Sequence, residues 1–440
     1  MPSWWTLQVR EREDDESVVD SRERMTRAPA SSGCRGRAGA TTVRFVAVVP
    51  RDVRFETEFL WGTATSAYQI EGGASNTDWW RFERQVGSPA AEPCGDACDS
   101  WRRYEEDLDI VASLGLDAYR FSLEWSRIQP SRGEVDESAL AHYRRVLEGC
   151  RARSLAPVVT LHHFTLPRWL ADEGGFENPA IVVRAAEYAE VVGAALGDLI
   201  AVACTINEPN IVAAMGYLAA MFPPGVSDRG RYVAVNETLR ASHRAMARAL
   251  RAGPGDFPIG LTLSMAEYEA MPGGEGPLED FRREMEDAYL REVDDDDFLG
   301  VQCYTKHLVG PDGLVWGGDG ELTDMGYLFW PQAVGYTLRR AAQWTSRPLI
   351  VTENGIGTTD DAQRVRYLAE ALRSLEGARR DGIDVRGYFQ WSLLDNFEWV
   401  LGYGPRFGLV AVDRTTFTRT PKPSAAWYAE AVREARRARA

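Results

Sequence analysis

The chain has 440 residues, 45% of them hydrophobic, and a formal net charge of −15. This length suits one α/β barrel with elaborated loops, or two to three smaller domains. The acidic charge repels nucleic-acid phosphates and anionic lipid headgroups, so we expect neither a nucleic-acid nor a membrane partner. No run of about eighteen apolar residues occurs, and the N-terminus is polar where a signal peptide would be apolar, so we expect a cytoplasmic protein.

The first 52 residues alternate charged and small side chains without sustained periodicity, apart from a short apolar piece at Val43–Val49. They predict a disordered N-terminal extension. A translation start assigned too far upstream explains the same pattern, with Met25 or a later residue as the true beginning. We therefore expect the folded domain to span residues 53–440.

Short β-rich runs alternate with amphipathic helical patterns along the rest of the chain. Eight runs predict strands: Phe59–Ala64, Ala118–Ser122, Ala156–Leu161, Val202–Ile206, Ile259–Leu263, Phe298–Tyr304, Leu349–Thr352 and Gly387–Trp391. Helical patterns between them include Tyr104–Leu114, Ala139–Ala152, Ile181–Leu196 and Gln363–Arg379. Alternation of this kind favours a parallel sheet with helices outside it.

The pattern favours a closed barrel over an open doubly wound sheet. An open sheet should show a glycine-rich phosphate turn after its first strand, and Trp61-Gly62-Thr63-Ala64 is not such a turn. Eight strand–helix units instead predict that residues 53–440 form one α/β domain, a (β/α)8 TIM barrel. Reactive side chains in such barrels lie at the C-terminal ends of the strands, where the following loops converge.

Two of the predicted strands end with a glutamate, Glu208 after the fourth strand and Glu353 after the seventh. Two carboxylates facing one pocket are the minimum for glycosidic cleavage, because one protonates the departing oxygen and the other stabilises or attacks the anomeric carbon. The alternative is a pair of solvated or salt-bridged glutamates. Other strand ends favour catalysis, since they carry groups suited to sugar hydroxyls and ring faces: Gln69, Glu71, Arg120, His162, His163, Asn207, Tyr304, Trp391, Glu398 and Trp399.

Six motifs, in order along the chain, resemble those of glycoside hydrolase family 1, the retaining β-glucosidases and β-galactosidases. The motifs are Phe59–Gly72, Tyr119–Ser122, Leu161–Phe164, Asn207–Pro209, Thr352–Gly355 and Gln390–Trp399. The likeness runs from about Phe59 to Tyr428. It implies a barrel that hydrolyses terminal β-D-glucosyl residues, and also fucosyl or galactosyl residues, of a small-molecule β-glycoside.

The resemblance implies a role for each matched catalytic position. Glu208 resembles the acid/base and Glu353 the nucleophile, which implies a covalent glycosyl-enzyme intermediate and carboxyl groups about 5 to 5.5 Å apart. Arg120 and Tyr304 resemble the partners that keep the nucleophile charged and aimed, and Asn207 belongs to the same set. With Glu353 ionised nearby, a second charge on Glu208 is disfavoured, so Glu208 holds its proton until the leaving group needs it.

The resemblance also implies a substrate-binding set. Positions that contact the sugar or its leaving group are Gln69, His163, Asn207, Trp391, Glu398, Trp399, Phe407 and Tyr327. Taken singly, Trp391 and Trp399 are equally consistent with core aromatics and His163 with a structural histidine. Glu398 disfavours the phospho-β-glycosidase branch, because its carboxylate would repel a phosphate.

Three features depart from the family pattern. Gln302-Cys303-Tyr304 stands where the family usually has Asn-Tyr-Tyr, and we expect Cys303 to be a packing residue. Tyr327 stands on the aglycone side, where the family more often has Trp. The stretch between Asn210 and Phe298 is shorter than usual for the family, which implies an open entrance suited to bulky aglycones.

The cysteines and histidines argue against a metal or another cofactor. The six cysteines are too few and scattered for a disulfide framework, so we expect reduced thiols. Cys94 and Cys98 bracket Gly-Asp-Ala, but no second pair with zinc spacing follows. A metal- or phosphate-dependent barrel would need ligand clusters or a glycine-rich phosphate loop, and neither is visible.

Two alternatives to a hydrolase stay open in the sequence. A transglycosylase would share every residue named above and pass the glycosyl group to an acceptor alcohol. A catalytically inactive sugar-binding barrel should have lost Glu208 or Glu353, and both are present. The natural aglycone and the choice between monomer and homo-oligomer are also open.

Overall fold

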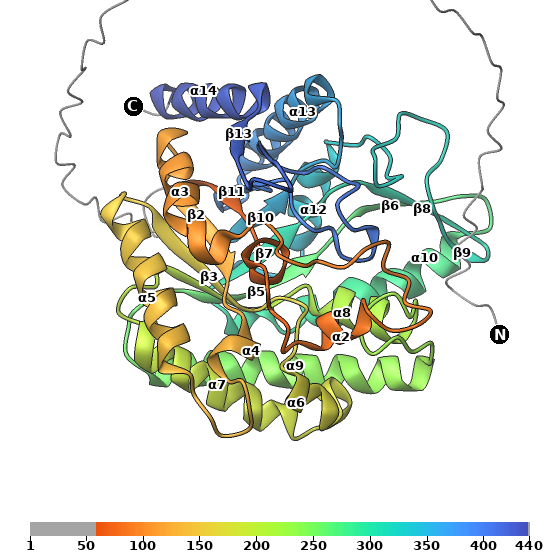
Figure 1. Cartoon of the computed structure of the whole chain (residues 1–440). Helices are drawn as coiled ribbons and strands as arrows, with labels where there is room; N and C mark the ends of the chain where they lie inside the picture. Colours follow the sequence, from red (N-terminus) through yellow and green to blue (C-terminus); the bar gives the residue numbers. More distant parts are fainter. Residues whose placement is uncertain (1–58, 439–440) are drawn as a thin grey trace, which may run out of the picture. The chain divides into compact units, whose positions relative to one another are not determined.

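The computed structural model describes residues 59–438, and these contain a closed barrel of eight parallel strands with helices outside it (Figure 1). Around the barrel the strands follow the order β1-β11-β10-β7-β5-β4-β3-β2. Their bounds are β1 Leu60–Ala64, β2 Ala118–Ser122, β3 Ala156–His162, β4 Val202–Asn207, β5 Ile259–Ser264, β7 Phe298–Gln302, β10 Leu349–Asn354 and β11 Val385–Trp391. The predicted (β/α)8 barrel is confirmed.

Almost every strand residue of the barrel is buried, because each strand faces the barrel interior on one side and the helical layer on the other. This double burial explains why the strands read in the sequence as short continuous apolar runs. The eight predicted strands match the observed ones to within two residues at each end. The strand β10 is longer than predicted, so that Glu353 lies within the strand and not after it.

Long helices pack around the barrel, and short ones lie in the loops. The helices are α1 Ala67–Glu71, α2 Asp78–Phe82, α3 Ser100–Ser113, α4 Trp125–Ile128, α5 Glu137–Ala152, α6 Arg168–Asp172, α7 Ile181–Leu196, α8 Pro209–Tyr217, α9 Arg229–Ala252, α10 Glu275–Arg282, α11 Ala288–Leu290, α12 Ala333–Ala341, α13 Asp361–Arg380 and α14 Pro423–Arg437. Single turns of other helix types are η1 Gly175–Glu177, η2 Arg283–Asp287, η3 Val293–Asp295 and η4 Trp399–Leu401.

Two of the predicted helices begin two residues earlier than their apolar pattern, and aspartate caps explain the difference. The Asp136 carboxylate accepts from two backbone N–H groups in the first turn of α5, and Asp360 accepts from the N–H of Ala362 in α13. Such a cap satisfies donors that would otherwise lack a partner, so the helix extends back to it. The apolar pattern alone marks only the part of each helix that packs on the barrel.

Two small sheets accompany the barrel. One has the order β6-β8-β9, where β6 is Glu267–Ala270, β8 is Lys306–Gly310 and β9 is Gly313–Val315. β8 and β9 form an antiparallel hairpin, whereas β6 pairs parallel with β8. The other sheet pairs β12 (Val410–Val412) with β13 (Arg419–Pro421). The sequence predicted neither sheet.

The five cysteines within residues 59–438 are free and buried, so the expected reduced thiols are confirmed for them. Within the same residues, none of the helices combines the length and the apolar character needed to cross a membrane. The predicted N-terminal extension, with Val43–Val49 and Met25, lies outside the described residues.

Candidate active site

Glu208 and Glu353 both lie at the C-terminal ends of barrel strands. Glu208 directly follows β4, and Glu353 is the fifth residue of the six in β10. Both side chains are buried, with 7% and 4% of their surface exposed. Buried carboxylates without partners would be very costly, so their surroundings decide what they can do.

The backbone at Glu208 is unusual. Its φ of 43° and ψ of 61° lie in the left-handed region, which non-glycine residues rarely adopt and which concentrates at functional sites. The Glu208 N–H donates to the carbonyl of Thr262 on β5 at 2.9 Å. Pro209 then opens α8, where proline fits because the first helical N–H needs no partner. The chain therefore turns sharply from strand to helix at Glu208.

Both carboxylate oxygens of Glu353 are held by side chains from other strand ends. The Arg120 guanidinium on β2 donates one N–H to Glu353 Oε1 at 2.5 Å and another to Asn207 Oδ1 at 2.6 Å. The Tyr304 hydroxyl, just after β7, donates to Glu353 Oε2. Arg120 is fully buried, so its charge faces that of Glu353 with little screening by water. These contacts pair the carboxylate of Glu353 with a cation and fix its direction.

Asn354 positions the loop that carries Tyr304. Its side-chain amide donates to the carbonyl of Cys303 at 2.6 Å and accepts from the Tyr388 hydroxyl at 2.8 Å. The Tyr367 hydroxyl donates to the carbonyl of Tyr304 at 2.8 Å. Asn354 belongs to the motif Thr352–Gly355, but the motif alone predicts no role for it. Its place directly after Glu353 was the one signal that pointed to it.

The two carboxyl groups differ in their electrostatic surroundings. Burial, and next the negative charge of Glu353, raise the pKa of Glu208 well above that of an ordinary glutamate. Burial and the charge of Glu353 also raise the pKa of Tyr304, so this phenol stays a hydrogen-bond donor. Burial, and then the charge of Arg120, lower the pKa of His163 well below its usual value, so the imidazole is neutral. A protonated Glu208 therefore stands beside a charge-paired Glu353.

Gln69 and Glu398, two of the predicted sugar-binding residues, lie side by side. The Gln69 amide donates to the carbonyl of Phe397 at 2.7 Å and lies 3.5 Å from Glu398 Oε2. Asn396 also accepts from Gln69, at 3.2 Å. Burial, aided by the charge of Glu353, raises the pKa of Glu398 to about 8. Asn396, for which the sequence pattern predicts no role, helps to hold this pair in place.

Aromatic rings gather around His163. Its ring stacks at 5.9 Å from Trp391 and at 6.2 Å from Trp399, with interplanar angles of 14° and 13°. Phe407 meets the edge of Tyr304 at 5.8 Å. Trp399 also stacks on Tyr68 in the core, with an interplanar angle of 7°. Trp399 therefore belongs both to the packing of the core and to this aromatic group.

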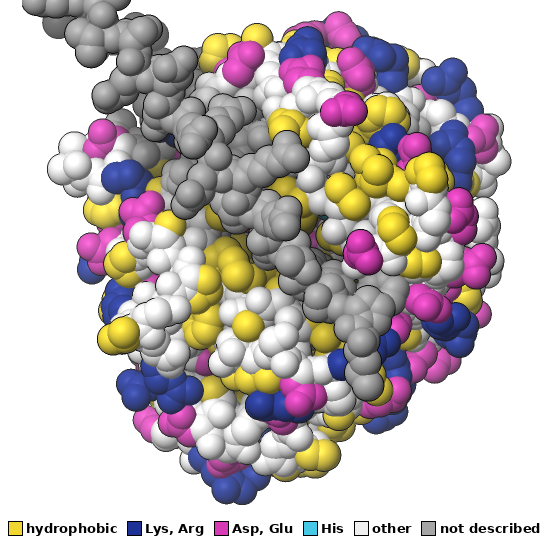
Figure 2. All heavy atoms as spheres, turned by 90° about the vertical axis from the view of Figure 1, so that its right-hand side faces the viewer, with side chains coloured by type: hydrophobic (Ala, Val, Ile, Leu, Met, Phe, Trp, Pro, Cys, Tyr) yellow, Lys and Arg dark blue, Asp and Glu magenta, His cyan; other side chains and the backbone are white. Residues whose placement is uncertain are grey.

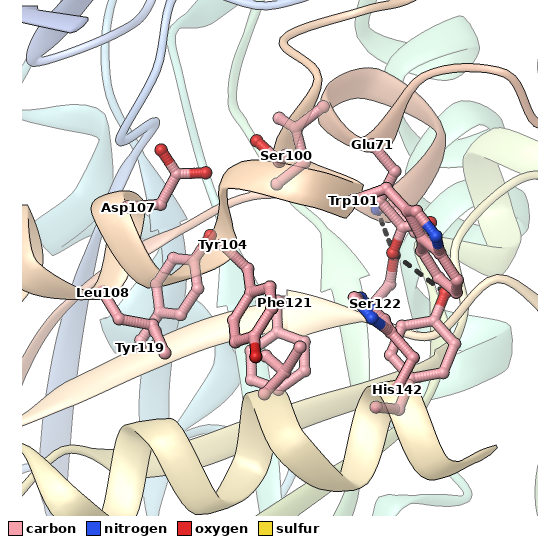
Figure 3. Close-up of a pocket in the computed structure, with 14 residues that line it drawn as sticks. Glu71, Ser100, Trp101, Tyr104, Asp107, Leu108, Tyr119, Phe121, Ser122 and His142 are labelled. Atoms are coloured by element: carbon pink, nitrogen blue, oxygen red, sulfur yellow. Dashed lines mark hydrogen bonds between the residues drawn. The ribbon is translucent and has the colours of Figure 1, made fainter. Parts of the chain in front are cut away.

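Two residues of the wider strand-end set do not join the site, so their inclusion was wrong. Glu71 accepts from Arg127 at 2.8 Å and from Tyr143 at 2.9 Å, and it lines a separate pocket between α3 and α5 (Figure 3). His162 packs against Phe176 at 5.3 Å, and burial lowers its pKa to about 3. Both residues sit close in sequence to members of the site, but neighbouring side chains on a strand or short helix point in different directions.

Cys303 is a packing residue, as expected from the sequence. Its side chain is fully buried, and burial raises the pKa of its thiol to about 12. Within residues 59–438 the structure contains no group of three or more His, Cys, Asp or Glu side chains arranged to hold a metal ion.

The sequence profile of glycosyl hydrolase family 1 matches residues 51–307 and 316–437. The chain belongs to this family. It is 35% identical to thermostable β-glucosidase B of Thermobispora bispora over 87% of this chain and 91% of that protein. It is 33% identical to β-glucosidase A of Thermotoga maritima over 86% of this chain and 98% of that protein.

Solved structures agree with this membership. A crystal structure of a β-glycosidase superposes with a TM-score of 0.80 at 42% identity, covering 86% of this chain and 96% of that one. The family resemblance inferred from the motifs is confirmed, and the protein is a glycoside hydrolase of the β-glucosidase type.

Proposed function

We propose that the protein is a retaining β-glucosidase that removes the terminal non-reducing β-D-glucosyl residue from small β-glucosides, with Glu353 as nucleophile and Glu208 as acid/base. The observation that carries this proposal is that the two buried carboxyl groups have different partners and different surrounding charges. Glu353 is paired with Arg120 and Tyr304, whereas burial and the charge of Glu353 keep the proton on Glu208. A retaining mechanism needs one ionised and one protonated carboxyl group of this kind.

In the first step, Glu353 attacks the anomeric carbon while Glu208 gives its proton to the glycosidic oxygen. The C–O bond to the leaving group breaks, the aglycone departs as an alcohol, and the glucosyl group is bound covalently to Glu353. Arg120 and Tyr304 keep the attacking oxygen in place. Once Glu353 is esterified its charge is gone, so the pKa of Glu208 falls and Glu208 becomes a base.

In the second step, the ionised Glu208 takes a proton from water, and the water oxygen attacks the anomeric carbon from the face that the aglycone left. The bond to Glu353 breaks and its carboxylate is restored. Two inversions at the same carbon give a β-sugar from a β-glucoside.

The paired Gln69 and Glu398, with His163 and Trp399, are proposed to bind the glucose hydroxyls, and Trp391 to lie beneath the sugar ring. A carboxyl group with a pKa of about 8 both donates and accepts near neutral pH, which suits neutral hydroxyls. Fucosides and galactosides are the next substrates to test, because an amide and a carboxyl group serve either orientation of the 4-hydroxyl.

The decisive experiment follows the anomer of the first sugar released from nitrophenyl β-D-glucoside by NMR. We expect β-glucose first, and α-glucose first would contradict the retaining mechanism. A transglycosylase would give a new glycoside when an acceptor alcohol is added, and a sugar-binding barrel would give no product.

Substitution separates the two catalytic roles. Glu353→Ala should abolish turnover of every glycoside, because no nucleophile is left. Glu208→Ala should spare formation of the intermediate from dinitrophenyl β-D-glucoside, whose leaving group needs no proton, while turnover of alkyl glucosides is lost. Equal losses on both substrates for Glu208→Ala would reverse the assignment of Glu208.

A further inference from the structure

The loop that joins β3 to α6, residues 163–167, begins with His163 and contains a strained backbone. Phe164, the second residue of the loop, has a φ of 70°, in the left-handed region that bulky side chains rarely adopt. Such a conformation costs free energy and persists only where neighbouring contacts hold it in place. The contacts of the next two residues, Thr165 and Leu166, therefore decide whether His163 keeps its direction.

Two buried carboxyl groups from other parts of the chain hold this loop. The Thr165 hydroxyl donates to Glu124 Oε2 at 2.9 Å. The Leu166 N–H donates to Asp78 Oδ1 at 2.9 Å, and the Leu166 carbonyl accepts from the Asp78 N–H at 2.9 Å. The loop is thus fixed through one side chain and through its own backbone, directly after the strained residue Phe164.

Each of the two carboxyl groups is itself anchored at the start of a short helix. Glu124 caps α4, because its Oε1 accepts from the Ser126 N–H at 3.1 Å. Asp78 is the first residue of α2, and its Oδ1 also accepts from the Trp79 N–H at 2.8 Å. Both carboxyl groups therefore join the start of a helix to the loop that carries His163.

The burial of Asp78 and Glu124 sets them apart from most acidic residues. On the face shown in Figure 2, acidic and basic side chains lie at the surface among one another, whereas Asp78 is 7% exposed and Glu124 only 1%. Burial raises the pKa of Asp78 to about 7 and also raises that of Glu124, and the hydrogen bonds that each accepts oppose this rise. A carboxyl group buried at such a cost needs these donors, so the contacts with the loop stabilise both partners.

We propose that Asp78 and Glu124 are positioning residues, which stabilise the strained turn at Phe164 and so aim His163 at the sugar. This inference rests on the proposed β-glucosidase function, in which His163 binds a glucose hydroxyl. Hydrogen bonds weaken steeply when their angle is poor, so a small rotation of the imidazole is enough to weaken sugar binding. Both carboxyl groups act through the loop and do not touch the substrate.

The first test compares Asp78→Ala with Asp78→Asn. For Asp78→Ala we expect kcat/KM for nitrophenyl β-D-glucoside to fall about three- to tenfold, the range of one hydrogen bond. Asp78→Asn should stay within about twofold of wild type, because its side-chain oxygen still accepts from the N–H groups of Leu166 and Trp79. Equal losses in the two variants would contradict positioning by these hydrogen bonds.

A double-mutant cycle with His163→Ala shows whether the effect passes through His163. In the His163→Ala background, Asp78→Ala should change kcat/KM by less than about twofold, because the residue that it positions is gone. Losses that simply add would overturn the proposal. Thr165→Val, which removes only the donor to Glu124, should give the same pattern, and Thr165→Ser should restore activity. These two variants decide the matter even if Asp78→Ala does not fold.

Asp136→Ala is the matched control, because the Asp136 carboxylate also accepts from two backbone N–H groups, at the start of α5 on the outside of the barrel. It should lower the melting temperature and leave kcat/KM unchanged. An equal loss of kcat/KM in Asp136→Ala would mean that general destabilisation explains the effect of Asp78→Ala. If wild type cleaves no β-glucoside, the proposed function fails, whereas additive losses in an active enzyme contradict only the positioning role.

Discussion

Glu353 and Glu208 lie on the same barrel but differ in their neighbours, so that Glu353 is paired with a cation and Glu208 keeps its proton. Arg120 and Tyr304 satisfy both oxygens of Glu353, and no comparable cation pairs with Glu208 among the described residues. The charge that Arg120 stabilises on Glu353 is in turn one cause of the raised pKa of Glu208. The pair therefore works as a unit, in which the proton of one member depends on the charge of the other.

This dependence predicts that Glu353→Gln lowers the pKa of Glu208. The neutral amide removes the repulsion, but burial, the larger cause, remains, so the pKa should fall and still exceed that of an ordinary glutamate. It can be measured by carbon NMR titration of protein with labelled glutamate carboxyls, with Glu208→Gln identifying the resonance. An unchanged pKa would mean that burial alone holds the proton.

The raised pKa of Glu208 also determines how activity depends on pH. The acid must be protonated in the first step, so kcat/KM is full below the raised pKa of Glu208 and declines as the pH rises through it. Since that pKa is well above the ordinary value, activity should persist through neutral pH. In Glu208→Gln this alkaline decline should disappear for substrates with activated leaving groups.

At the scale of elements, the sequence predicted the eight barrel strands, because each strand is buried on both sides and therefore reads as a short apolar run. It could not predict the β8–β9 hairpin, whose three-residue strand β9 is partly exposed and carries no such run. Among the candidate site residues, Arg120 and Tyr304 contact Glu353, and Gln69 lies beside Glu398. Glu71 and His162 were misassigned, because proximity along the chain does not determine which way a side chain points.

Arg364 is a further element-scale feature that no sequence pattern indicated. This buried arginine on α13 joins the loop after β10 to the segment before β12 by donating to four carbonyls: those of Ile356, Thr358, Arg406 and Phe407. Its fifth partner is Asp361 at 3.0 Å. Phe407 contacts Tyr304, so this arginine helps to support the site from behind.

We expect Arg364→Met to lower the free energy of unfolding by about 3 kcal/mol or more, because four carbonyls, three of them in buried hydrogen bonds, lose a charged donor at once. Arg366→Met, on the same helix, is the control. Arg366 is 52% exposed and pairs with Glu321, so its loss should change stability by less than about 1 kcal/mol. Denaturant unfolding of both variants measures the difference, and equal values would show that the buried contacts contribute little.

At the scale of the whole molecule, one closed barrel brings together the residues that hold Glu353. Arg120, Asn207 and Glu353 come from β2, β4 and β10, and the barrel brings Arg120 within hydrogen-bonding distance of both Asn207 and Glu353. A single strand missing from the ring would open it and separate these side chains. The integrity of the barrel and catalysis should therefore be lost together.

We propose that residues 53–440 suffice for folding and activity, which leads to a paired truncation experiment. A chain beginning at residue 53 keeps β1 (Leu60–Ala64), and its kcat/KM and melting temperature should match those of the full chain. A chain beginning at residue 67 lacks β1, which pairs with both β11 and β2, so the barrel cannot close and both measurements should collapse. Loss of activity in the first truncation, with its melting temperature unchanged, would instead assign residues 1–52 a direct part in catalysis.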